Sequence, residues 1–231
     1  MFKQLAHDLL NLFYPLSCTA CGKALNGQEK FLCFHCNFSL PKTDFHTYLQ
    51  NPTYQIFYGR VPIKNAASFL YFAKDGMVQN MMHHLKYKNQ KELGTYLGKM
   101  YGKILKEQTE WSQSELIIPV PLHKSKLRKR GYNQSESFAI GLSLAMDKPL
   151  FKHHLIRRRA SETQTKKSRI ARWENVADIF EIHLSEQLAG KKILLVDDVV
   201  TTGATLESCA QALLNSCKGI EINIATIAFA T

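Results

Sequence analysis

The stretch Ile193-Leu-Leu-Val-Asp-Asp-Val-Val-Thr-Thr-Gly-Ala-Thr205 carries most of what this sequence says about its fold. Residues 192–196 are almost entirely apolar, which is typical of a strand buried on both faces of a parallel sheet. Two aspartates follow, and a Thr/Gly loop then leads into a helix predicted over 204–214. Ligands of open α/β sheets bind at the carboxyl ends of the strands. The stretch therefore predicts an α/β fold with a binding site at the end of this strand.

The Thr/Gly loop has the chemistry of a phosphate site. Backbone N–H groups and hydroxyls gather there at the start of a helix, where the helix dipole favours an anion. Gly203 lets the backbone approach the phosphate closely. The residues predicted to bind the phosphate-bearing ligand here are Val199, Thr201, Thr202, Gly203, Ala204 and Thr205. The chain has neither a GxxxxGK[ST] loop nor a GxGxxG fingerprint, so this is not one of those two nucleotide sites.

Asp197 and Asp198 are the candidate catalytic residues. Because they are adjacent, they point in different directions, and we expect them to accept hydrogen bonds from sugar hydroxyls. Two acids that faced a phosphate directly would repel it. A sugar between the acids and the phosphate resolves this conflict, and so does a divalent cation.

Other apolar runs alternate with helical patterns along the second part of the chain. Strands are predicted over 67–72, 116–120, 179–182 and 220–229, and helices over 76–87, 91–107 and 134–146. This alternation is typical of a mostly parallel sheet with helices on both faces. Residues 122–133 and 157–175 are predicted as basic, polar loops.

Composition supports a globular protein with an affinity for phosphate-bearing partners. The 231 residues are 45% hydrophobic and 21% charged, which excludes a wholly disordered chain. A formal net charge of +11 suits nucleic acids, nucleotides or sugar phosphates, although it is also compatible with a merely basic surface. No continuous apolar run is long enough to cross a bilayer, and residues 2–14 resemble an amphipathic helix rather than a signal peptide. We therefore expect a cytoplasmic protein without membrane insertion.

Four cysteines predict a structural metal site. Cys18 and Cys21 form one C-x2-C pair, and Cys33 and Cys36 form a second after an 11-residue spacer. Two such pairs supply the tetrahedral four-sulfur site that suits zinc. Redox-active pairs or free buried thiols do not explain this spacing. The metal is expected to contribute folding energy to a segment too short to form a core alone.

Three parts follow from these patterns. Residues 1–40 are predicted as an N-terminal helix and a small zinc-ribbon-like module, residues 41–64 as a linker or irregular connection, and residues 65–231 as the α/β domain.

Two segments are strongly basic. Residues 123–130 hold five lysines and arginines without an acid, and residues 157–172 hold seven against the single acid Glu162. Either segment can follow a nucleic-acid backbone, or can instead be a solvated, charged loop. The residues predicted to contact nucleic acid are Lys86, Lys88, Arg128, Lys129, Arg130, Arg158, Arg159, Lys166, Lys167, Arg169 and Arg172.

The string VDDVVTTGAT, residues 196–205, resembles the phosphoribosyl-pyrophosphate (PRPP) motif of type I phosphoribosyltransferases. Together with the four-cysteine module, the chain resembles the ComF family of bacterial competence proteins over almost its whole length. Further segments that carry this resemblance are Leu85-Lys-Tyr87, Pro119-Val-Pro-Leu122, Arg130-Gly-Tyr-Asn-Gln134 and the stretch from Gln164 through Arg172 and Asn175-Val176 to Phe180.

The resemblance implies a type I phosphoribosyltransferase fold and binding of PRPP with magnesium. In the resembled fold, the loop that begins at Leu122, His123 and Lys124 meets the pyrophosphate. The resemblance also implies a role in natural transformation, with single-stranded DNA and a helicase-like protein as partners. Two alternatives stay open: an active transferase that moves ribose 5-phosphate from PRPP to an unidentified nitrogen base, and a nucleic-acid-binding module without pocket chemistry.

Overall fold

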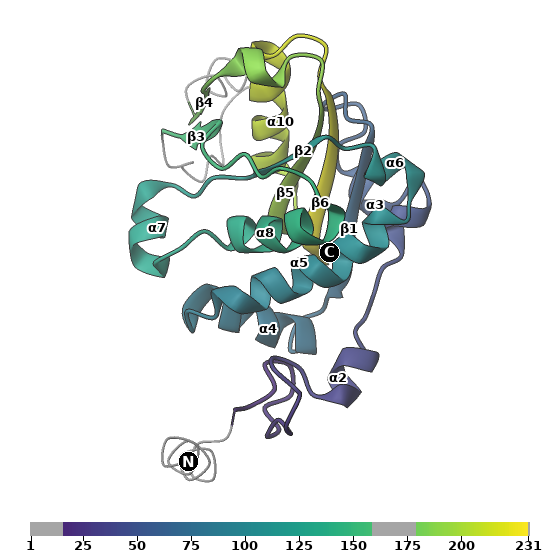
Figure 1. The fold of residues 1–231 in the computed structure, drawn as a ribbon, viewed down its shortest axis with the longest axis vertical. Coiled ribbons are helices and arrows are strands. Elements are labelled where there is room, and N and C mark those ends of the chain that lie inside the picture. Colours follow the sequence, from purple (N-terminus) through teal and green to yellow (C-terminus); the bar gives the residue numbers. More distant parts are fainter. Residues whose placement is uncertain (1–15, 159–178, 231) are drawn as a thin grey trace.

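A parallel four-stranded sheet forms the centre of the chain in the computed structural model, which describes residues 16–158 and 179–230. Its strands are β1 (Asn65–Phe72), β2 (Leu116–Pro119), β5 (Lys192–Val200) and β6 (Glu221–Ala230). They lie in the order β1-β6-β5-β2, and every pair is parallel (Figure 1). The predicted α/β fold with a mostly parallel sheet is thus confirmed.

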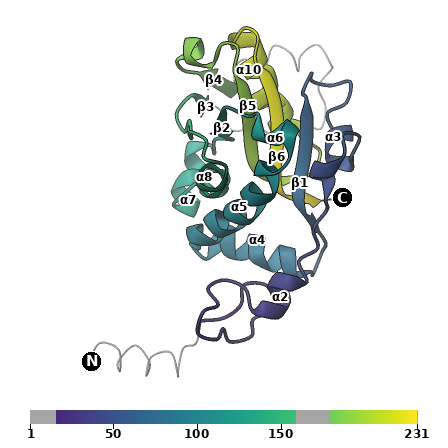
Figure 2. The same cartoon turned by 45° about the vertical axis from the view of Figure 1, so that its right-hand side comes forward.

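The inner strand β6 is covered on both faces of the sheet. Residues 222–229 of β6 are all buried, which requires cover on both sides. Three helices lie together beside the sheet: α4 (Met77–Tyr87), α5 (Lys91–Lys106) and α8 (Gln134–Met146) (Figure 2). A fourth helix, α10 (Ala204–Ser216), follows β5.

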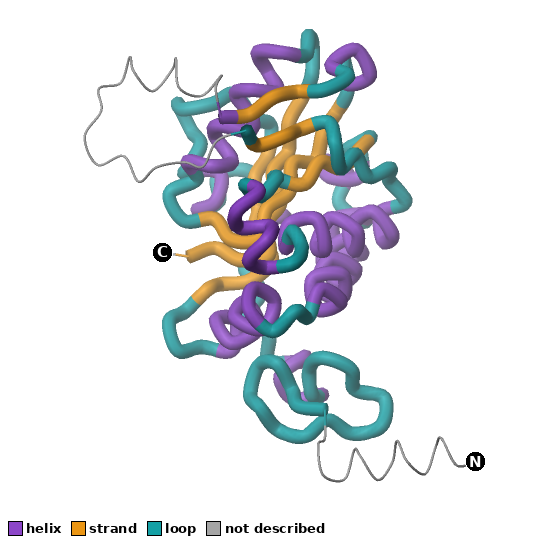
Figure 3. Tube along the Cα trace, turned by 90° about the vertical axis from the view of Figure 1, so that its left-hand side faces the viewer, coloured by secondary structure: helices purple, strands orange, loops and turns teal. Residues whose placement is uncertain are grey.

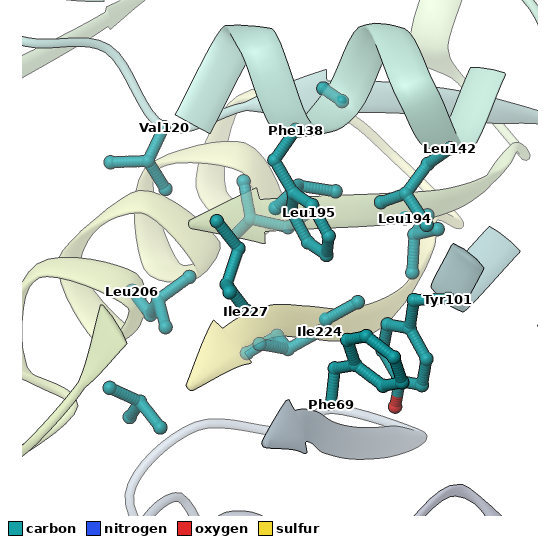
Figure 4. Packing of buried hydrophobic residues seen from close by; sticks show 14 of the residues in the cluster. Phe69, Tyr101, Val120, Phe138, Leu142, Leu194, Leu195, Leu206, Ile224 and Ile227 are labelled. Atoms are coloured by element: carbon teal, nitrogen blue, oxygen red, sulfur yellow. The ribbon is translucent and has the colours of Figure 1, made fainter. Parts of the chain in front are cut away.

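Close packing between α5 and α8 brings apolar side chains onto the sheet. Phe138 and Leu142 of α8 face Leu194, Leu195 and Ile224 of the sheet in the core (Figure 4), and these side chains are buried. The two helices approach at glycines, since a Cβ on Gly98 would overlap the carbonyl oxygen of Phe138. The N-terminus of α8 is thereby fixed beside the carboxyl end of β5.

Strand β5 is longer than the sequence analysis predicts. The prediction ends the strand at Val196, but the strand continues through both aspartates to Val200. The reason lies in the partner strand: Val199 pairs with Ala228 and Val200 with Phe229 of β6. The two aspartates are therefore strand residues rather than loop residues.

The basic segment 122–133, predicted as a loop, contains helix α7 (Lys124–Arg130). At the start of α7, the side chain of His123 accepts a hydrogen bond from the backbone N–H of Ser125. At its end, Gly131 adopts a left-handed conformation with φ +79°. These two caps explain a helix that has no apolar face.

Segment 41–64, predicted as a linker or irregular connection, contains the short helices η1 (Phe45–Thr47) and α3 (Pro52–Gln55). Phe45 and Phe57 of this segment are buried in the main core. Other short elements are α2 (Phe34–Phe38), α6 (Thr109–Ser112), η2 (Ser185–Leu188), and the antiparallel pair β3 (Leu155–Arg157) and β4 (Phe180–Ile182).

The cysteine-containing segment packs against α4 and α5 at one end of the molecule (Figures 2 and 3). Asn80 of α4 donates a hydrogen bond to the carbonyl oxygen of Ala20 at 2.8 Å. Tyr96 of α5 donates to Asn37 at 3.1 Å and packs its ring on Phe31. The predicted helix over 2–14 lies outside the described residues.

No helix within residues 16–158 and 179–230 combines the length and apolar character needed to span a membrane.

Candidate functional site

A small polar hollow lies at the carboxyl end of β5. It has a volume of about 70 Å³. The residues that line it are Asp197, Val199, Val200, Thr201, Thr202, Gly203, Ala204, Thr205 and Leu206. The structure thus brings together the first acid, the Thr/Gly loop and the start of α10, as the sequence predicts for a phosphate site.

The loop presents the N-terminus of a 13-residue helix to the hollow. Gly203 is the N-cap of α10 in a left-handed conformation with φ +72°, and its carbonyl accepts from the N–H of Glu207 at 2.8 Å. The first N–H groups of a helix have no partner within the helix, so those of the first turn of α10 are available to an anion. Thr201, Thr202 and Ala204 are exposed to solvent, as an entering ligand requires.

Asp197 is held from the side of α8. Its Oδ1 accepts hydrogen bonds from the hydroxyl of Ser135 at 2.7 Å and from the backbone N–H of Asp198 at 2.8 Å. Burial, and next the adjacent charge of Asp198, raise the pKa of Asp197 to about 7, although the Ser135 hydrogen bond opposes this rise. Near neutral pH the pair therefore carries less negative charge than two free carboxylates would.

Asp198 takes a different set of partners, as expected for neighbouring residues of a strand. Its Oδ1 accepts from the backbone N–H of Val199 at 2.7 Å. Its Oδ2 lies 3.0 Å from the ammonium nitrogen of Lys86, and the two side chains are only 15% and 23% exposed. Lys86, predicted to contact nucleic acid, thus points at the acid pair of the candidate site.

Helix α7 holds three of the residues predicted to contact nucleic acid: Arg128, Lys129 and Arg130. None of its residues is buried, and Arg128 and Lys129 are exposed. Arg130 instead donates to the side chain of Gln134 at 2.8 Å, at the start of α8. The hydroxyl of Tyr132 donates to the carbonyl oxygen of Leu85, which ties this segment to the last turn of α4.

Of the other predicted nucleic-acid contacts, Lys88 and Arg158 lie within the described residues. Lys88 is exposed directly after α4. Arg158 makes a two-pronged ion pair with Glu181, with both N–O distances at 2.6 Å. Arg159, Lys166, Lys167, Arg169 and Arg172 lie outside the described residues. Leu122 and His123, which precede α7, are half-buried, and Lys124 is exposed.

The four predicted cysteines converge on one point. All four sulfur atoms lie within 4.8 Å of one another, and the Sγ atoms of Cys21 and Cys33 are 3.8 Å apart. A tetrahedral site with zinc–sulfur bonds of ~2.3 Å has sulfur–sulfur edges of about 3.8 Å. The donor set and its spacing therefore fit a metal ion of this kind.

The backbone around the cluster favours thiolates. Burial raises the pKa of Cys18, but N–H groups aimed at its sulfur, first that of Cys33, outweigh burial and lower the pKa to about 7. Burial and the neighbouring sulfurs raise the pKa of Cys36. Four thiolates this close repel one another, so a bound cation is needed to hold all four ionised.

Two residues of the site escape the sequence analysis. Ser135, which holds Asp197, lies 62 positions before it in the sequence. Arg60, which contacts the Thr/Gly loop, lies 142 positions before its partner Thr202. The one sequence feature that points toward Ser135 is its position directly after Arg130–Gln134, a segment that carries the family resemblance.

Comparison with known proteins agrees with this geometry. Residues 132–230, which begin just after α7 and run through β6, match the phosphoribosyl transferase domain family. A chain with this sheet, this acid pair and this loop is a phosphoribosyltransferase-type α/β protein.

Similarity over longer stretches identifies the subgroup. The chain is 29% identical to the DNA utilization protein YhgH of Escherichia coli K12 over 213 residues, 89% of this chain and 87% of that protein. It is 33% identical to the competence protein ComFC of Bacillus subtilis over 112 residues, 48% of this chain and 43% of that protein. Together with the four-cysteine cluster, these similarities support a ComF-family protein.

Among solved structures, the glutamine PRPP amidotransferase of B. subtilis complexed with ADP and GMP matches with a TM-score of 0.43 and 20% identity. That match covers 62% of this chain and 30% of the amidotransferase.

Proposed function

We propose that the hollow at the end of β5 binds PRPP. The 5′-phosphate would lie on the N–H groups of the Thr201–Thr205 loop, and the ribose hydroxyls would donate to Asp197 and Asp198. The observation that carries this proposal is the position of Asp197 beside the first N–H groups of α10, in one hollow of about 70 Å³, with Asp198 next to it in the strand. The phosphoribosyl transferase family match over these residues supports it.

The pyrophosphate of PRPP would extend toward Leu122, His123 and Lys124, which precede α7. Lys86 would remain beside Asp198, where its ammonium reduces the repulsion between the acid pair and the phosphates. Asp197, which Ser135 orients, would present its other oxygen to the sugar.

The oxygen donors of the site fit magnesium as part of a PRPP complex. Asp198 uses one oxygen for the Val199 N–H and the other for Lys86, so a cage made of protein groups alone does not form around it. Magnesium is commonly bound through one or two carboxylates together with substrate phosphates and water. When bound, it would neutralise the charge of the pyrophosphate.

Calorimetric titration tests PRPP binding. In buffer with magnesium, the wild-type protein is expected to bind PRPP, and Asp198→Asn is expected to weaken binding by about tenfold or more, since a neutral amide accepts sugar hydroxyls less strongly. Gln113→Glu, an isosteric change at the opposite end of the sheet, is the control. A wild-type protein that gives no heat with PRPP would contradict the proposal.

We further propose that the protein acts in DNA uptake and binds single-stranded DNA through α7. The names of its relatives, a DNA utilization protein and a competence protein, support this role. The exposed basic face of α7 supports a phosphate-binding surface, and Tyr87, which is 60% exposed, offers a ring on which a base can stack. A helicase-like partner and a cytoplasmic location complete this role.

Salt dependence tests the DNA proposal. Each phosphate contact on a single strand contributes about −0.7 to the slope of log K against log salt. Replacing Lys126, Arg128 and Lys129 of α7 together by Gln should therefore reduce that slope by about 2. The matched control replaces three exposed lysines of α5: Lys99, Lys103 and Lys106. Equal slopes for the two triple variants would exclude α7 as the DNA-binding surface.

The alternative is an active phosphoribosyltransferase, which the intact acid pair and loop favour. In that reaction the bond from C1 of ribose to pyrophosphate breaks as a bond to a ring nitrogen of a base forms, and the protein mainly positions groups and stabilises charge. Release of pyrophosphate from PRPP in the presence of one member of a panel of bases would establish this activity.

We propose zinc as the metal of the cysteine cluster, with a structural role. Four cysteine ligands close the coordination shell and leave no position for a substrate. Elemental analysis of protein purified without chelators is expected to find zinc.

A further inference from the structure

Arg60 reaches the Thr/Gly loop from a distant part of the chain. It lies after α3, in the segment predicted to be a linker, and it is 39% exposed through its side chain. Its Nη1 donates to two carbonyl oxygens at 2.9 Å, those of Ile56 and Thr202. Its Nη2 pairs with the carboxylate of Glu207 in the first turn of α10. One guanidinium thus joins its own segment, the loop and the helix.

The bond to Thr202 fixes the direction of a whole peptide group. The peptide between Thr202 and Gly203 is trans. In a trans peptide the C=O and the N–H point in opposite directions. Because Arg60 holds the carbonyl oxygen of Thr202, the N–H of Gly203 points away from the guanidinium, and Gly203 is one of the residues that line the hollow.

The same segment also limits where Gly203 can move. Ile56 and Phe57 pack so closely behind Gly203 that a Cβ there would lie 2.9 Å from a ring carbon of Phe57. Phe57 is completely buried. This segment lies outside residues 132–230, the part of the chain that matches the transferase domain family.

We propose that Arg60 is a positioning residue for phosphate recognition, which orients the Thr202–Gly203 peptide so that its N–H donates to the 5′-phosphate of the ligand. The inference rests on the proposed function, because it concerns the same hollow. Arg60 is assigned no ligand contact of its own, because its guanidinium is taken up by the carbonyl oxygens of Ile56 and Thr202 and by the Glu207 carboxylate.

Comparison of two ligands tests this role. On the proposed function, ribose 5-phosphate would bind on the Thr201–Thr205 loop, whereas inorganic pyrophosphate would bind at Leu122, His123 and Lys124 and would not need the loop. Arg60→Met is expected to weaken ribose 5-phosphate binding by about tenfold in calorimetry, the effect of one misaligned hydrogen bond to a charged group. Pyrophosphate binding should stay as in the wild type. The matched control is Lys64→Met, in the same segment as Arg60, which removes an exposed ion pair between Lys64 and Glu221.

A spectroscopic measurement separates orientation from general stability. The chain has 12 glycines, so ¹⁵N-glycine labelling gives a sparse amide spectrum in which Gly203 can be assigned with Gly203→Ala. In the wild type and in Lys64→Met, the Gly203 amide should shift strongly with ribose 5-phosphate. In Arg60→Met the shift should be lost, and Arg60→Lys, which keeps the charge but not the two-carbonyl geometry, should recover it only in part.

The outcomes distinguish this inference from the proposed function. A wild-type protein that binds neither ribose 5-phosphate nor PRPP would overturn the proposed function, and the inference with it. A wild-type protein that binds both, together with a folded Arg60→Met variant of equal affinity and equal Gly203 shift, would overturn the inference alone.

Discussion

Replacement of Gly203 by alanine tests how the phosphate loop is supported. Gly203 and Gly190 have nearly the same positive φ, +72° and +70°. A methyl group at Gly203 would overlap Cγ2 of Ile56 and lie 2.9 Å from Phe57, whereas at Gly190 it would meet nothing within 4 Å. Both variants therefore place an alanine in a left-handed conformation, but only Gly203→Ala also creates a steric overlap.

The shared cost is the left-handed conformation, about 1–2 kcal/mol for an L-residue. Overlap with a packed side chain adds about 1–3 kcal/mol, and the buried ring of Phe57 leaves little room for relaxation. We expect Gly190→Ala to lower the free energy of unfolding by about 1–2 kcal/mol and Gly203→Ala by about 2–5 kcal/mol. Only Gly203→Ala displaces the loop, so only this variant should lose affinity for ribose 5-phosphate.

Urea denaturation and calorimetry measure the two effects. The double variant Gly203→Ala/Ile56→Ala removes the Cγ2 atom that the new methyl group would meet. It should be more stable than the sum of its single changes predicts, because the clash and the cavity compensate. Equal unfolding free energies for Gly203→Ala and Gly190→Ala, with unchanged ligand affinity for both, would refute the described packing behind the loop.

Three further predictions follow from the site. Replacing Cys36 by Ser should release the bound zinc and lower the thermal midpoint, measured by elemental analysis and calorimetry; a variant with full zinc content would exclude a four-sulfur site. A folded-state pKa of about 7 for Asp197, above its ordinary 3.8, means that the wild type loses stability as pH rises from about 4 to about 7. Asp197→Asn should not lose stability in this way as pH rises. It should therefore be more stable than the wild type at pH 8 but not at pH 4. Parallel pH–stability curves for the two proteins would contradict the raised pKa. Lys86→Met leaves Asp198 without its cation and should weaken PRPP binding by about tenfold relative to the exposed-lysine control Lys103→Met, whereas equal or tighter binding would show that Lys86 only competes with the sugar.

Local patterns explain why the centre of the site is predictable from sequence. The apolar run of β5, the two acids and the Thr/Gly loop are consecutive, so their chemistry and their place at a sheet edge can be inferred together. The cysteine pairs are equally local, and the four sulfurs converge as their spacing indicates.

Contacts between distant segments explain what sequence reasoning misses. Nothing near Lys86 indicates that its ammonium faces Asp198, because α4 must first be placed against the sheet. The prolines of segment 41–64 suggest a linker, yet Pro52 is the first residue of α3 and follows the capping side chain of Asn51. A proline is favourable at that position. The residues that support the loop from behind therefore come from a segment whose composition indicates no role.

A crystal structure of the protein grown with PRPP and magnesium measures the central claim most directly. The 5′-phosphate should lie within hydrogen-bond distance of the backbone N–H groups of Gly203 to Thr205, with the ribose hydroxyls on Asp197 and Asp198. PRPP bound elsewhere, or a loop that stays open to water in crystals with ligand at saturating concentration, would contradict the account.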